Sequence, residues 1–249
     1  MATSFGALCT DFYINHKIGL KMDLPADRET VLHLFDRVRG ELPDMNRFKR
    51  FSDELALESP RLEGAYRWIA LRQNSIRSGS VNPESMDEGY QLHELALRLA
   101  PFFLSVSALD IRGLELSLGF DLECKANHHA VVAEALFPAN SAMGSLLDVR
   151  GAQPLDVQPI VGLALEERSG LRAFFEVKSR TTPGQVRAGR YRTEPITVVL
   201  TLRRGGPIDE VEQLPELLTT MRRRAESLAE EKLVPNLLTP ISRAILGGV

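Results

Sequence analysis

Residues 114–124 alternate apolar and polar side chains more regularly than any other part of the chain. The apolar positions are Leu114, Leu116, Leu118, Phe120, Leu122 and Cys124, and polar or small residues stand between them. Side chains of a strand alternate between its two faces, so this period of two predicts a strand with one buried and one polar face. We expect this strand to lie in a mostly antiparallel sheet.

Helix signals lie on both sides of this strand. The predicted helices begin after Asp27, at Asn82-Pro83 and after Asn127, with a further helical turn at Met143–Leu147. A long helix comes last, because apolar residues between Leu214 and Leu228 share one face and acidic residues cluster at its start.

Other segments have the pattern of extended chain. The predicted strands are one or two between Phe12 and Leu24 with a turn at Asn15-His16-Lys17, a hairpin of Phe48–Glu58 and Tyr66–Arg77, and strands at Pro159–Glu167, Leu171–Arg180 and Pro195–Arg204. A polar, flexible loop is expected between the last two, from Thr182 to Arg190.

This order of elements predicts an α+β fold of two consecutive ferredoxin-like units of the β-α-β-β-α type, with a mostly antiparallel sheet and a long C-terminal helix. The units span residues 1–110 and 111–249 and join around 104–113. The alternative is one continuous domain that shares a sheet. No residue-level repeat supports the division, so it rests on the order of elements.

Composition narrows the class of protein. Thirty Lys and Arg against 33 Asp and Glu give a net charge of -3, so we do not expect a nucleic-acid partner. No stretch of about 18 apolar residues predicts a membrane span, and the first eleven residues lack the pattern of a secretory signal. Two distant cysteines in a chain of 249 residues suit a reducing compartment. We therefore expect a cytoplasmic protein that does not contact a membrane.

The common catalytic signatures are absent. The sequence has no Gly-Lys-Ser/Thr of a phosphate-binding loop, no G-x-G-x-x-G, no G-x-S-x-G and no C-x-x-C, and His93-Glu94 lacks the second histidine of a zincin helix. We assign no catalytic residue and expect no cofactor.

One candidate site lies where the alternating strand meets the next helix. Its residues Asp121, Glu123, Cys124, His128 and His129 are acid/base or metal-ligating types. Adjacent histidines on a helix diverge by about 100°, so His128 and His129 are weak metal candidates and we expect no metal. The alternative interpretation is a helix cap with neighbouring solvated histidines.

A second candidate site consists of charges on the polar strand faces. Glu115, Asp121 and Glu123 would stand across an antiparallel sheet from Arg172, Lys178, Arg180 or Arg203. Such arginines hold a carboxylate or phosphate by two hydrogen bonds. Ordinary cross-strand ion pairs on a solvated face are the other interpretation.

The third candidate is the basic segment 178–204, which adds Arg190 and Arg192. It could hold phosphate or RNA, but aromatic side chains for stacking are scarce because Trp68 and most phenylalanines occupy positions that look buried.

We expect a non-catalytic binding protein that contacts a protein partner or a small anionic ligand between the two units. The expected ligand-binding residues are Arg172, Lys178, Arg180, Arg190, Arg192, Arg203, Asp121 and Glu123. Ferredoxin-like units often associate through their sheets, which favours a homodimer by analogy. The alternatives are an enzyme with Asp121 or Glu123 as acid or base and His128 or His129 as partner, and an RNA-binding protein that uses residues 178–204.

Overall fold

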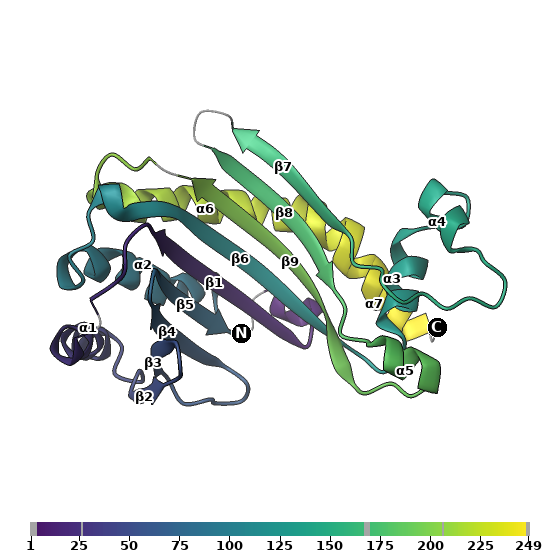
Figure 1. The fold of residues 1–249 in the computed structure, drawn as a ribbon, viewed down its shortest axis with the longest axis horizontal. Helices are drawn as coiled ribbons and strands as arrows, with labels where there is room; N and C mark the ends of the chain where they lie inside the picture. Colours follow the sequence, from purple (N-terminus) through teal and green to yellow (C-terminus); the bar gives the residue numbers. More distant parts are fainter. Residues whose placement is uncertain (1–3, 26, 167–169, 206, 248–249) are drawn as a thin grey trace.

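One antiparallel sheet of nine strands runs through the whole molecule (Figure 1). The computed structural model describes residues 4–25, 27–166, 170–205 and 207–247. The strand order is β2-β3-β4-β5-β1-β6-β9-β8-β7, and every neighbouring pair is antiparallel.

The first half of the chain contributes five of these strands. Its elements are β1 (Asp11–Leu20), α1 (Arg28–Glu41), β2 (Arg47–Arg50), β3 (Glu54–Glu58), β4 (Tyr66–Arg72), β5 (Ser75–Val81) and α2 (Met86–Phe103), with a short 3-10 helix at Gly6–Leu8. The strands from β2 to β5 form a meander that starts at the edge of the sheet and returns to β1.

The second half repeats this layout. Its elements are β6 (Ile111–Cys124), α3 (His128–Leu136), α4 (Ala142–Leu147), β7 (Ile160–Glu166), β8 (Leu171–Lys178), α5 (Pro183–Ala188), β9 (Glu194–Gly205), α6 (Leu214–Leu228), the π-helical segment η4 (Ala229–Leu238) and α7 (Thr239–Gly247), with 3-10 turns at Ala108–Asp110 and Val211–Gln213. The meander from β7 to β9 returns to β6, as β2 to β5 return to β1, and β1 and β6 pair at the centre.

The predicted α+β class and the strand at 114–124 are confirmed, but two ferredoxin-like units are not. A ferredoxin-like unit is a split β-α-β arrangement, in which the two strands joined by a helix have one other strand between them. Here α1 joins β1 to the edge strand β2, and three strands, β3, β4 and β5, lie between these two. The result is one large sheet.

Several local predictions are wrong because short turns divide the strands differently. Residues 15–17 do not turn, since His16 lies inside β1 with its side chain on the buried face. The predicted hairpin of two strands is four strands, β2 to β5. The predicted loop at 182–190 contains α5, which a capping box between Thr182 and Gln185 starts. Glu167, the predicted end of a strand, lies outside the described residues.

The N-caps predicted at Asp27 and Asn127 are confirmed, but the bounds of two other helices differ from the prediction. Asp27 accepts a hydrogen bond from the N–H of Thr30, and Asn127 accepts one from His129. The second helix starts later than predicted, with Ser85 as N-cap instead of Asn82. The last helix continues past Leu228 through η4 and α7, and Pro235, which lacks an N–H, lies in the π-helical segment.

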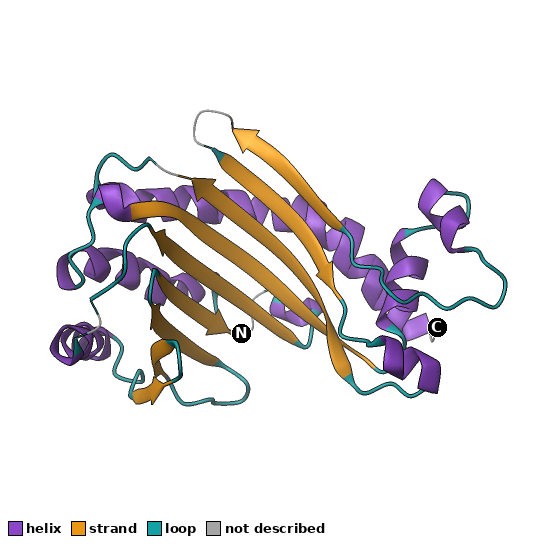
Figure 2. Cartoon of the chain, viewed as in Figure 1, coloured by secondary structure: helices purple, strands orange, loops and turns teal. Residues whose placement is uncertain are grey.

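Helices cover one face of the sheet and leave the other open. α6 passes behind the strands in Figure 1, and Figure 2 shows no helix in front of them. On the helix side, β1 buries Phe12, Ile14 and Ile18, and β6 buries Leu116 and Phe120. No helix among the described residues has the length and apolar character to cross a membrane.

Two histidines, one in β1 and one in α2, are buried where these elements pack together. The rings of His16 in β1 and His93 in α2 lie 5.8 Å apart, and Nδ1 of His93 lies 2.7 Å from the Ser78 hydroxyl. Burial lowers the pKa of His16 to about 4 and keeps the pKa of His93 well below 6.5. Both rings are therefore neutral in the folded protein at neutral pH.

This pair predicts a loss of stability in mild acid. Between pH 6.5 and 4 the unfolded chain binds protons that the folded chain excludes, so the free energy of unfolding falls as the pH is lowered. For His16 the loss approaches about 3 kcal/mol near pH 4. Urea unfolding at pH 7.5 and 5 measures it. His16→Leu should flatten the pH dependence, and the exposed control His33→Gln should leave it unchanged; equal slopes in both variants would contradict this explanation.

Candidate functional site

The face of the sheet without helices is the candidate site, and we call it the open face. Residues at alternate positions of β1 lie on it, from Asp11 through Tyr13, Asn15 and Lys17 to Gly19. Their cross-strand neighbours continue it over β6, β9 and β8 on one side and over β5 and β4 on the other. Two hollows lie on this face, one near each end of β1.

The first hollow, which we call the junction hollow, measures about 530 Å³. It is lined by Asp11, Tyr13, Asn15, Arg61, Gly64, Tyr66, Trp68, Val81, Asp121 and Arg180. Three aromatic rings, two carboxylates and two guanidinium groups therefore meet there. Both halves of the chain contribute, because β1, β4 and β5 come from the first half and Asp121 and Arg180 from the second.

Asp11 and Asp121 are direct neighbours across β1 and β6. The Thr197 hydroxyl donates a hydrogen bond of 2.6 Å to Oδ1 of Asp121, and Nδ2 of Asn82 donates one of 2.6 Å to Oδ1 of Asp11. Burial raises the pKa of Asp121, and the Asp11 charge adds to this, whereas the Thr197 hydrogen bond and the Arg180 charge oppose it. The hollow thus holds a carboxyl group that protonates more readily than an exposed aspartate.

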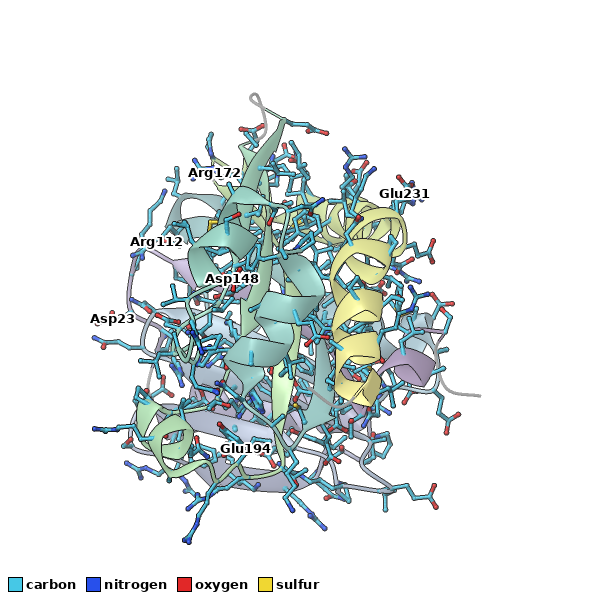
Figure 3. All side chains as sticks on the ribbon, turned by 90° about the vertical axis from the view of Figure 1, so that its right-hand side faces the viewer. Asp23, Arg112, Asp148, Arg172, Glu194 and Glu231 are labelled. Carbon is cyan, nitrogen blue, oxygen red and sulfur yellow. The ribbon has the colours of Figure 1, made fainter. Side chains whose placement is uncertain are left out.

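The second hollow, which we call the basic hollow, measures about 380 Å³. It is lined by Lys17, Gly19, Asn74, Arg112, Gly113, Leu114, Glu115, Gly170, Arg172, Arg203, Arg204 and Gly205. Five of these residues are cationic and only Glu115 is anionic. Figure 3 shows Arg112 and Arg172 on the same side of the molecule, away from the C-terminal helices that carry Glu231.

Glu115 does not neutralise the basic hollow. Its carboxylate lies 3.2 Å from Nζ of Lys17 and 3.6 Å from Nε of Arg203, so two cations share one negative charge. Arg112 and Arg172 have no carboxylate within 4.0 Å among the described residues. Gly19, Gly113 and Gly205 are cross-strand neighbours, which keeps the floor of the hollow free of side chains.

The residues predicted from sequence are divided between these places. Asp121 and Arg180 lie in the junction hollow, and Arg172 and Arg203 are cross-strand neighbours in the basic hollow. Lys178 pairs with Glu176 at 3.1 Å and lines neither hollow. The remaining three, Glu123 at the end of β6 and Arg190 and Arg192 after α5, line neither hollow.

His128 and His129 are buried and use their ring nitrogens for protein contacts. Nδ1 of His128 accepts from the N–H of Arg180, and its Nε2 lies 3.3 Å from the Cys124 carbonyl oxygen. Nδ1 of His129 accepts from the N–H of Val157, and its Nε2 lies 3.1 Å from the Thr181 carbonyl oxygen. With both Nδ1 atoms accepting, the Nε2 atoms carry the protons, and no ring lone pair remains for a metal. No group of three metal-ligating side chains was found in the described part of the chain.

Sequence reasoning missed the aromatic residues of the open face. Trp68 was expected in the core, yet it is partly exposed, as are Tyr13, Tyr66 and Phe174. Three of these rings lie directly over a glycine of the adjacent strand. If each glycine were an alanine, its Cβ would lie too close to the nearest atom of the ring. These distances are 2.3 Å for Gly79 and Trp68, 2.0 Å for Gly119 and Tyr13, and 3.0 Å for Gly162 and Phe174. An isolated glycine inside a strand indicates that another group approaches the backbone closely, so these glycines were the sequence signal that could have located the rings.

Gly119 therefore tests how tightly the rings are seated. In Gly119→Ala the new methyl group collides with the Tyr13 ring, and we expect a loss of about 1–3 kcal/mol of unfolding free energy. Urea denaturation measures it, and the double variant Gly119→Ala/Tyr13→Ala should recover part of the loss. Gly205→Ala is the matched control, since nothing lies within 4 Å of its Cβ position. Equal costs at Gly119 and Gly205 would contradict close seating.

Comparison with known proteins adds no functional information: no protein-family model matches the chain, and no curated protein is significantly similar to it. The function must be argued from the open face itself.

Proposed function

We propose that this chain is a non-catalytic binding protein that holds a small anionic ligand in the basic hollow, between the two halves of the sheet. The observation that carries the proposal is the excess of cations over carboxylates among residues that line one concave surface. Arginine binds carboxylate and phosphate groups through paired N–H donors, so ligands with such groups fit best.

The arrangement of these cations supports the proposal. Arg172 and Arg203 stand side by side on β8 and β9, and Lys17 approaches from β1 on the other side of Glu115. Arg204 also borders the hollow, but it alternates with Arg203 along β9 and pairs with the core residues Leu114 and Leu171, so its side chain lies on the helix-covered face and does not support the proposal.

Larger hollows elsewhere are weaker candidates for an anion-binding site. One of about 690 Å³ contains Arg67, but this side chain already pairs with Asp44 at 3.0 Å and Glu88 at 3.5 Å. Another, of about 550 Å³, is mainly apolar and includes Phe48 and Phe51. In the first, four carboxylates outnumber one arginine, and in the second, three arginines stand beside two carboxylates, so neither has the excess of cations found in the basic hollow.

An enzyme that uses the junction hollow is the second candidate. The raised pKa of Asp121, caused chiefly by burial beside Asp11, suits a general acid. The histidines assigned as its partners, His128 and His129, bind backbone groups instead. Binding therefore remains the better supported function.

A second copy of the chain is the protein partner that we propose, through the edge strand β7. Its residues Ile160–Leu165 carry no charge, and Ile160, Val161 and Leu163 are exposed. An uncharged edge pairs without burying a charge only with another uncharged strand, which a second β7 supplies. The opposite edge, β2, has Arg47, Lys49 and Arg50 and would repel its own copy.

Oligomer measurements test this pairing. Light scattering coupled to size exclusion should find a dimer of the wild-type chain at micromolar concentration. Leu163→Lys places a charge on each edge strand and should give a monomer, while Leu146→Lys, on the exposed surface of α4, should not. A monomeric wild-type protein, or a dimer that persists with Leu163→Lys, would overturn the proposal.

Anion binding is tested with pyrophosphate and citrate at constant ionic strength. A bound anion should raise the melting temperature, and a ligand at 100 times its Kd adds about 2.7 kcal/mol of stability. Arg172→Gln/Arg203→Gln should weaken binding at least tenfold by calorimetry. Arg190→Gln/Arg192→Gln removes the same charge outside both hollows and should bind normally. Failure of both anions to bind, or equal loss in the two double variants, would refute the basic hollow as the site.

A further inference from the structure

The aromatic residues of the open face are each accompanied by an arginine. The guanidinium of Arg61 lies 4.3 Å from the ring centre of Tyr66, that of Arg77 5.6 Å from Trp68, and that of Arg203 4.7 Å from Phe174. Tyr13 shares the junction hollow with Arg180. A ring that can stack and a cation that can hold a phosphate therefore recur across the face.

Arg77 lies over the Trp68 ring and Arg203 over the Phe174 ring, so a stacking base would take the place of the guanidinium group, which would turn to a neighbouring phosphate. Trp68, Tyr13 and Phe174 lie over glycines of β5, β6 and β7, so the backbone and not a side chain supports each ring. With strands about 4.8 Å apart, the first two rings are separated by about 10 Å across the sheet and the last two by about 14 Å. This spacing suits an extended polymer with several rings better than a single small molecule.

From these observations we infer that the open face binds single-stranded nucleic acid, with unpaired bases on Trp68, Tyr13 and Phe174 and phosphates on the neighbouring arginines. The inference rests on the proposed anion binding and extends it, because the basic hollow would hold one stretch of the backbone. Stacking on aromatic rings beside cations is the general mode of single-strand binding.

The carboxylates on the same face favour a ligand that has bases over a polyanion that has none. Asp11 and Asp121 line the junction hollow beside Tyr13, and Glu176 lies on β8 next to it. Carboxylates accept hydrogen bonds from the exocyclic amino groups of bases and repel phosphates. A ligand that offers only negative charge would meet repulsion in the middle of the face.

The expectation from sequence was that nucleic acid is not a partner, because aromatic residues looked buried and the net charge is -3. The first reason fails for Trp68, Tyr13, Tyr66 and Phe174, which are partly exposed on one face. The second concerns the whole chain, whereas phosphates meet the local cations.

Trp68 is the only tryptophan of the chain and provides the readout. Titration with an eight-nucleotide single strand of adenylate RNA, and separately of its DNA counterpart, should quench Trp68 emission at micromolar concentration. A polyphosphate of eight phosphates should bind without quenching. Quenching by RNA, DNA or both supports the inference and identifies which backbone is preferred.

Phe174→Ala removes a stacking ring far from the reporter and should weaken the binding of the single strand roughly tenfold. Phe102→Ala, on the exposed end of α2, is the matched control and should have no effect. If Phe174→Ala does not unfold cooperatively, Phe174→Leu keeps an apolar side chain and removes the aromatic surface.

The outcomes separate this inference from the proposed function. Pyrophosphate binding in the basic hollow without quenching by either single strand would overturn nucleic-acid binding and leave anion binding intact. Equal affinity for a duplex of the same length, equal affinity of Phe174→Ala and wild type, or quenching by maltohexaose alone would also overturn it. Failure of pyrophosphate, citrate and both single strands would overturn both proposals.

Discussion

The antiparallel pairing of β1 with β6 is the contact on which the rest of the molecule depends. It joins two halves that each close their own meander, β5 onto β1 and β9 onto β6, and so makes one sheet of them. The same pairing places Lys17 opposite Glu115 and Asp11 opposite Asp121. Both hollows therefore contain residues of both halves, and neither half holds a complete site.

The unequal covering of the two faces follows from this sheet. The helices α2 and α6 pack against one face and bury the apolar residues of β1 and β6. The open face must be stable in contact with water, and it uses rings seated on glycines and cross-strand ion pairs for this purpose. In the proposed function the same groups also contact the ligand, so one set of side chains would serve both the stability of the surface and recognition.

The sequence predicted what depends on local pattern. The alternation of 114–124 identified β6 and its buried face, and the caps at Asp27 and Asn127 placed the starts of α1 and α3. It did not predict the meander of four strands, because turns of two or three residues, as between Arg72 and Ser75, leave little signal in an extended segment. The order of strands is set by long-range pairing and could not be read from any window of residues.

Recognition of the candidate site was limited in the same way. Arg172, Arg203 and Asp121 could be identified as polar residues of strands, but which of them meet depends on the register of β6, β9 and β8. Trp68 was misplaced because an aromatic residue in a strand is usually part of the core. Only the pairing of β4 with β5 brings its ring over Gly79 and reveals it as a surface residue.

The pairing register of β1 with β6 determines which side chains lie on the open face, and no single contact has as large an effect. A shift of β1 by one residue against β6 would turn Lys17 and Tyr13 toward the helices and His16 toward water. The apolar residues Ile14 and Ile18 would leave the core in the same step, at a cost far above the worth of an exposed ion pair. The packing under α2 and α6 therefore fixes the positions of the open-face residues, which contribute little to their own placement. Their identities are constrained by the glycines beneath the rings and, under the proposed function, by the ligand.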